Sequence, residues 1–161
     1  MNREDAMRLM LMAGTALLIA GCATNPQDRH AVLMVSMSGI QEVPGPGDPD
    51  GNGTVEIRVT PGQGSVCWNL YARAIEPATA AHIHRGAAGV AGPVVLMLTT
   101  PDAAGRSQGC ATVDQALARE IAWRGHDFYV NVHDAPHPAG AIRGQLRGGP
   151  APREPRQPVS R

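Results

Sequence analysis

The fold is decided by the stretch Ala81-His82-Ile83-His84-Arg85-Gly86-Ala87-Ala88-Gly89-Val90-Ala91-Gly92-Pro93-Val94-Val95-Leu96. His82 and His84 lie two positions apart, so in an extended strand both side chains leave the same face. Three glycines, Gly86, Gly89 and Gly92, follow at a spacing of three, which is typical of a loop that needs positive φ or a close backbone approach. After Pro93, residues 94–98 predict a buried strand.

A second stretch, residues 128–133 followed by residues 140–146, predicts two further strands. In the first of them, three apolar residues share one face, while Tyr129, Asn131 and His133 share the other. In the second, Arg143 lies between Ile142 and Gly144, and we expect it to bind backbone carbonyls or a carboxylate, as a structural contact of the glycine-rich loop.

These motifs, together with Gln41-Glu42-Val43-Pro44, resemble the CHRD domain, the module named after its repeats in chordin and also found singly in bacterial proteins. The resemblance covers residues 30–147, and its three separated motifs occur in order. It implies an extracytoplasmic binding or structural module. The sequence departs from the family pattern at two positions: Asp134 replaces a frequent Thr, and Ala141 replaces a frequent Glu. Any role that the family's Glu has is therefore not expected here.

The rest of the chain predicts a mainly β fold. Residues 54–60 and 65–72 alternate between apolar and polar, residues 31–37 are apolar, and residues 113–123 form the one convincing helical pattern. Breaker-rich residues 45–53 predict a surface loop, because their acidic groups lack the spacing of a calcium loop. Residues 99–108 are expected to form another loop. About seven strands and one short helix indicate an antiparallel β-sandwich or barrel, superoxide-dismutase-like or immunoglobulin-like.

The N-terminus predicts export and lipidation. Residues 1–21 have the apolar run of a signal peptide, and Ile19-Ala20-Gly21-Cys22 resembles a bacterial lipobox. We expect Cys22 to carry lipid and to begin a tether over residues 22–29, with an ordinary cleaved signal peptide as the alternative. The domain would then lie in the bacterial cell envelope, anchored to the outer membrane and facing the periplasm or the cell surface. Residues 148–161 predict a disordered tail.

Two cysteines remain for the domain, Cys67 and Cys110. In an oxidising compartment we expect a disulfide between them, and two separate buried thiols are the alternative. The formal net charge is zero, and there is no basic stripe, so a nucleic-acid partner is not expected. The expected partners are the membrane, through the lipid, and a protein or other component of the envelope.

His82, His84 and His133 are the candidate metal ligands, because a same-face pair and a third histidine from another strand could hold one copper or zinc ion. Asp134 and Asn131 could orient an imidazole. The alternative is that these histidines bind loop backbone. His30, His126 and His137 are expected to be solvated. The pattern is also similar to copper/zinc superoxide dismutase, but residues 85–110 contain no histidine and only Asp102, so a dinuclear centre is not expected.

Two functional hypotheses follow. The first is a lipid-anchored binding or structural module of the envelope, and the second is a small metalloprotein, redox-active or metal-sequestering, that uses the three histidines. No Ser-His-Asp or Cys-His set has support in the sequence, so the sequence favours a protein without catalysis.

Overall fold

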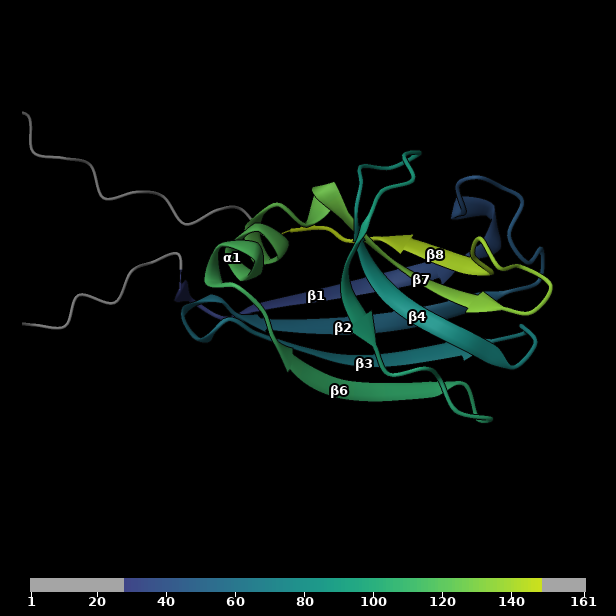
Figure 1. Cartoon of the computed structure of the whole chain (residues 1–161), viewed down its shortest axis with the longest axis horizontal. Coiled ribbons are helices and arrows are strands. Elements are labelled where there is room, and N and C mark those ends of the chain that lie inside the picture. Colours follow the sequence, from purple (N-terminus) through teal and green to yellow (C-terminus); the bar gives the residue numbers. More distant parts are fainter. Residues whose placement is uncertain (1–27, 149–161) are drawn as a thin grey trace, which may run out of the picture.

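The computed structural model describes residues 28–148 (Figure 1). The predicted signal peptide, Cys22, most of the tether and all but the first residue of the tail lie outside these residues. The strands are β1 Ala31–Ser38, β2 Asn52–Thr60, β3 Ser65–Arg73, β4 Ala78–Arg85, β5 Val94–Leu98, β6 Arg106–Thr112, β7 Phe128–Asp134 and β8 Ile142–Gln145. The helices are α1 Gln115–Trp123 and the 3-10 turns η2 Gly39–Gln41, η3 Pro61–Gln63 and η4 Gly125–Asp127. Among residues 28–148, no helix is long and apolar enough to cross a membrane.

The strands form one antiparallel sheet in the order β5-β4-β7-β8-β1-β2-β3-β6. This sheet curls into a nearly closed barrel, and Figure 1 shows β4 and β7 crossing in front of the layer formed by β1, β2, β3 and β6. The predicted mainly β sandwich or barrel with one short helix is confirmed.

The barrel interior is filled by the apolar residues of the alternating strands, because every second side chain points inward. Val55, Ile57 and Val59 of β2 are fully buried. At one end, α1 covers the interior with its buried face, Ala118, Ile121 and Ala122. The helix begins at Gln115 rather than Val113, because Asp114 is its N-cap and accepts hydrogen bonds from the backbone N–H groups of the first turn.

Strand β6 was not predicted as such: the loop expected over residues 99–108 ends early, and the strand begins at Arg106. Its sequence, Arg-Ser-Gln-Gly-Cys-Ala-Thr, lacks an alternating apolar pattern. Gly109 explains part of this, because a Cβ there would lie 2.6 Å from the ring of Trp68 on the neighbouring strand. The indole therefore fills the inward position, and the strand is defined by its pairing with β3 rather than by its own hydrophobicity.

Cys67 and Cys110 form a disulfide, so the predicted bridge is confirmed and the alternative of two separate thiols is wrong. The two residues are directly opposite each other on β3 and β6, with their Cα atoms 4.0 Å apart. The bridge therefore joins two paired strands on the outer face of the barrel, one of which, β6, is an edge of the sheet.

Candidate metal centre

The candidate site lies on the outer face of the barrel, where β4 and β7 run side by side. Opposed residues across these strands are His84 with Tyr129, His82 with Asn131, and Ala80 with His133. The core-facing positions between them are apolar. The histidines thus point away from the core, as the alternation predicts, and loops rather than other strands cover them.

Three imidazoles converge on this face. One ring nitrogen from each of His82, His84 and His133 lies within 4.8 Å of the others. The ring centroids of His82 lie 5.4 Å from those of His84 and 5.0 Å from those of His133. The predicted convergence of these three side chains is therefore confirmed.

Backbone carbonyls determine which nitrogens are free. His84 Nδ1 lies 2.9 Å from the Gly92 carbonyl and His133 Nδ1 lies 3.0 Å from the Pro138 carbonyl. A carbonyl can only accept, so both Nδ1 atoms carry the proton and both Nε2 atoms offer a lone pair. His82 Nδ1 donates to His133 Nε2 at 3.1 Å. His84 Nε2 is buried without a hydrogen-bond partner.

The electrostatics keep two of these imidazoles neutral. Burial lowers the pKa of His82 to about 4, and His133 and His84 add to this shift. Burial also lowers the pKa of His133, although the carbonyl of Pro138 opposes the shift. Both side chains are therefore uncharged at neutral pH, the form in which an imidazole coordinates a metal.

The glycine-rich loop, residues 86–93, covers His84 and contacts it through a backbone carbonyl. Arg85 N donates to the Pro93 carbonyl and closes the loop. Gly89 has φ +78°, and a Cβ on Gly92 would lie 1.7 Å from the Arg85 carbonyl. Both reasons expected for the glycine spacing, positive φ and close approach, therefore apply. The tight loop brings the Gly92 carbonyl to His84.

His84 belongs to a stacked column of three side chains, in which the Tyr129 ring lies between His84 and Arg143. The His84 ring lies on that of Tyr129, with centroids 4.7 Å apart and planes 9° apart. The Arg143 guanidinium carbon lies 3.4 Å from the centroid of the same tyrosine ring. Arg143 also donates to the carbonyls of Ala87 and Val90, at 3.0 Å each, so one cation connects the loop to the column.

Glu42, from the motif of residues 41–44, is buried close to this cation. Burial raises the pKa of the Glu42 carboxyl to about 7, and Arg143 and the backbone N–H of Val43 partly oppose the shift. Sequence reasoning gave neither Glu42 nor Tyr129 a role. The one indication in the sequence that Glu42 contributes to the site is that it belongs to the first of the three CHRD-like motifs. Its proximity to Arg143 shows that the first and third motifs lie side by side in the folded chain.

The sequence suggested that Asp134 could orient one of the three imidazoles, but its carboxylate hydrogen-bonds other groups. Its Oδ1 accepts hydrogen bonds from the ring and the backbone N–H of His137, at 2.8 and 2.9 Å, and its Oδ2 accepts one from Glu76 N. The expectation that His137 is solvated is therefore wrong, whereas His30 and His126 are exposed.

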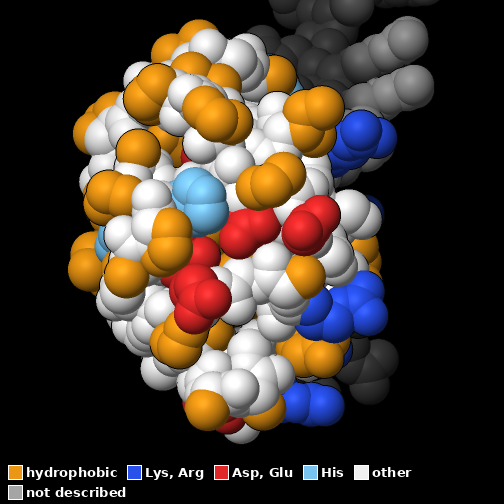
Figure 2. All heavy atoms as spheres, turned by 90° about the vertical axis from the view of Figure 1, so that its right-hand side faces the viewer, with side chains coloured by type: hydrophobic (Ala, Val, Ile, Leu, Met, Phe, Trp, Pro, Cys, Tyr) orange, Lys and Arg blue, Asp and Glu red, His pale blue; other side chains and the backbone are white. Residues whose placement is uncertain are grey.

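Figure 2 shows acidic side chains around a histidine at the end of the barrel opposite α1. The carboxylates of Asp48 and Asp134 bind backbone N–H groups and hold loops together.

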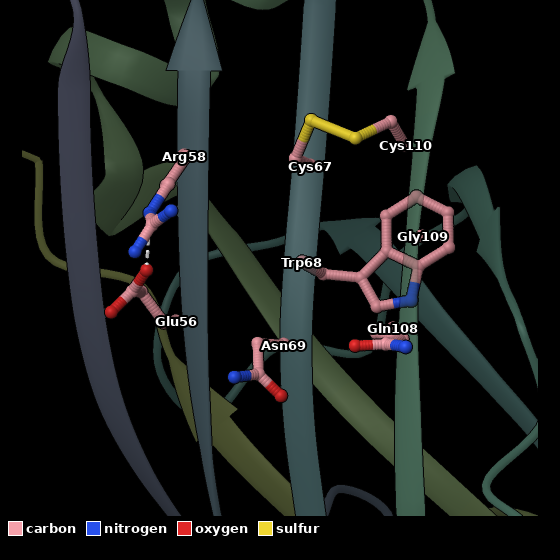
Figure 3. Close-up of a pocket in the computed structure, with 8 residues that line it drawn as sticks. All are labelled: Glu56, Arg58, Cys67, Trp68, Asn69, Gln108, Gly109 and Cys110. Atoms are coloured by element: carbon pink, nitrogen blue, oxygen red, sulfur yellow. Dashed lines mark ion pairs between the residues drawn. A yellow bond between two sulfur atoms is a disulfide. The ribbon is translucent and has the colours of Figure 1, made fainter.

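A separate hollow lies on the outer face of β2, β3 and β6, beside the disulfide (Figure 3). Glu56 and Arg58 form an ion pair along its wall. This hollow belongs to other strands than the histidine cluster, and its charged groups neutralise each other. It is therefore not part of the histidine cluster.

The fold and site define a class: a disulfide-linked, antiparallel β-barrel module with a polar cluster under its loops. The family model of the CHRD domain matches residues 33–146, so the chain belongs to the CHRD family. Searches of curated proteins and of solved structures found no match. Family membership supports an extracellular-type binding or structural module, and together with the disulfide it indicates an extracellular or envelope protein.

Proposed function

We propose that this protein is a non-catalytic binding module of the cell envelope and that its ligand is one transition-metal ion, copper or zinc, held by His82, His84 and His133. The observation that carries the proposal is the buried, unpartnered Nε2 of His84 beside the neutral imidazoles of His82 and His133. A buried polar atom without a partner costs roughly 1–3 kcal/mol. A bound ion would supply the missing partner.

The geometry supports coordination with small movements. A tetrahedral ion with bonds of about 2.0–2.1 Å holds its nitrogens about 3.3 Å apart. His82 Nδ1 and His133 Nε2 are 3.1 Å apart. An ion would replace the proton between them, and this proton would move to Nε2 of His82. The carbonyls of Gly92 and Pro138 already orient the other two rings, as backbone acceptors do around metal-bound histidines.

The test is metal binding by the chain purified without a histidine tag. We expect one zinc or copper ion per chain by elemental analysis and titration calorimetry. His84→Ala should lower the affinity by at least about 100-fold, whereas the control His126→Ala, at an exposed position, should leave it unchanged. If the wild-type chain binds neither metal at micromolar concentration, the cluster is a hydrogen-bonded structural element and His84→Ala will only lower the melting temperature.

The pH dependence provides a second readout. Protons compete with metal for imidazole nitrogen, so affinity must fall as pH falls. An ordinary imidazole begins to compete near pH 6.5. Because the pKa of His82 is lowered to about 4 and that of His133 is also lowered, competition at these two ligands begins at lower pH. We expect substantial binding at about pH 5.5, where a site of three exposed histidines would be largely protonated.

We propose further that Cys22 carries lipid and anchors the module to the outer membrane. The lipobox-like Ile19-Ala20-Gly21-Cys22 after an apolar run supports this. Intact-mass measurement of protein extracted from membranes should show acyl groups on a chain that begins at Cys22. Cys22→Ser should give an unmodified form. A wild-type protein that is unmodified, or that begins elsewhere, would contradict the proposal.

A further inference from the structure

Asn131 occupies the middle position of the strand face that carries the three imidazoles. On the shared face of β4 and β7, the pair His82–Asn131 separates the row of His84 from the row of His133. Successive same-face residues are about 6.8 Å apart along a strand, so His84 and His133 start about 14 Å apart in that direction. Their ring centroids are only 6.4 Å apart. Both rings therefore lean over the middle row, where Asn131 faces His82.

The Asn131 side chain has a buried oxygen without a partner. The residue is 2% exposed, and its Oδ1 accepts no hydrogen bond within the described chain. Among residues 28–148, only four buried side-chain atoms lack a partner: His84 Nε2 and Asn131 Oδ1 on the shared face of β4 and β7, and Glu42 Oε1 and Arg143 Nη1 beside it. His84 Nε2 and Asn131 Oδ1 are both electron-pair donors, so they cannot satisfy each other. A shared positive ion between them would satisfy both.

We propose that Asn131 is the fourth ligand of the metal centre, through Oδ1. This inference rests on the proposed function. It adds a neutral oxygen donor to three imidazole nitrogens, so the protein itself fills the coordination sphere of a four-coordinate ion. A closed sphere is typical of structural or storage sites, whereas catalytic sites keep one position open. An oxygen donor also suits a divalent ion, zinc or Cu²⁺, better than the softer Cu⁺.

His82 makes direct contact by Asn131 reasonable. An ion bound at Nδ1, the ring nitrogen nearer the backbone, lies closer to the sheet than one bound at Nε2. Residues directly opposite on antiparallel strands have Cβ atoms about 4.5–5.5 Å apart. A short side chain such as Asn131, opposite His82, can therefore reach an ion held between the two strands.

The experiment uses cobalt(II) in place of zinc, because its visible absorption reports coordination number and ligand exchange. In the wild-type chain, added azide should leave the spectrum unchanged, since no position is open. In Asn131→Ala, cobalt affinity should fall by at least about tenfold and azide should change the spectrum. Asn131→Asp keeps an oxygen donor, so it should bind cobalt at least as tightly as wild type and stay insensitive to azide. The control Asn69→Ala alters an exposed asparagine on β3 and should behave as wild type.

The outcomes separate this inference from the proposed function. If wild type binds cobalt but azide changes its spectrum as in Asn131→Ala, an exogenous ligand fills the fourth position and the inference is wrong, while the three-histidine site stands. Wild-type affinity in Asn131→Ala has the same meaning. If wild type binds no cobalt, zinc or copper, both proposals fail. Should Asn131→Ala not fold, the Asp variant decides: loss of binding there would overturn the inference.

Discussion

Replacing Arg143 by Met is expected to destabilise the fold by about 2–4 kcal/mol, because a buried group left without its hydrogen-bond partner costs roughly 1–3 kcal/mol and Arg143 serves more than one such group. Arg143 is 1% exposed, so its contacts are made away from water. Met fills a similar volume but removes the hydrogen bonds to two loop carbonyls: the Val90 carbonyl loses its Arg143 donor, and the Ala87 carbonyl keeps only the hydrogen bond from Val90 N. It also removes the cation from the Tyr129 ring and the positive charge near Glu42.

Urea unfolding of the disulfide-intact chain would measure this loss. Arg143→Lys should be intermediate, because Lys keeps the charge but lacks the planar donor set that binds two carbonyls and stacks on a ring. The control is Arg58→Met, an exposed arginine whose loss should change stability by less than about 0.5 kcal/mol. A change below about 1 kcal/mol in Arg143→Met would mean that the loop does not depend on this cation.

Removing the disulfide should have an effect of similar size. The bridge joins cysteines 43 residues apart, and closing such a loop restricts the unfolded chain by about 4 kcal/mol. For a domain of this size, the double variant Cys67→Ser/Cys110→Ser should melt about 10–20 °C below wild type. β6 should be affected first, because it is an edge strand that pairs only with β3.

Reductant provides the matched control for this prediction. It should lower the melting temperature of wild type to that of the double variant and leave the double variant unchanged. Amide hydrogen exchange in β6 should be faster in reduced wild type and in the double variant than in oxidised wild type. If wild type and the double variant melt within about 3 °C of each other, strand pairing and the helix α1 hold β6 without the bridge.

Much of the candidate site could be predicted from sequence, because it depends on strand periodicity. The two-residue period put His82 and His84 on one face and His133 on the face opposite Phe128, Val130 and Val132. The period cannot say which strands become neighbours. The pairing of β4 with β7, which makes His82 oppose Asn131, joins segments almost 50 residues apart and follows from closing the whole sheet.

The contacts of the buried charged residues could not be predicted from the sequence either. Arg143 was expected to bind carbonyls or a carboxylate, but the identity of those carbonyls, and the tyrosine ring beneath the guanidinium, depend on how the glycine-rich loop folds back over β8. Asp134 was expected to orient one of the three candidate imidazoles. It follows His133 directly in the chain, yet successive strand residues point to opposite faces, and its side chain binds His137 instead.

Four properties could be predicted from the amino-acid sequence: the fold class, the inward and outward faces of the alternating strands, the disulfide pair and the membership of the three motifs in one domain. These are local or pairwise properties: residue spacing, backbone freedom at glycine, and two cysteines in one exported domain. Three others are visible only in the folded chain: Arg106–Thr112 is a strand, Glu42 lies buried near Arg143, and the Nε2 of His84 and the Oδ1 of Asn131 lack partners. Such properties depend on which groups exclude water from one another, and that is settled only when the sheet closes and its loops pack.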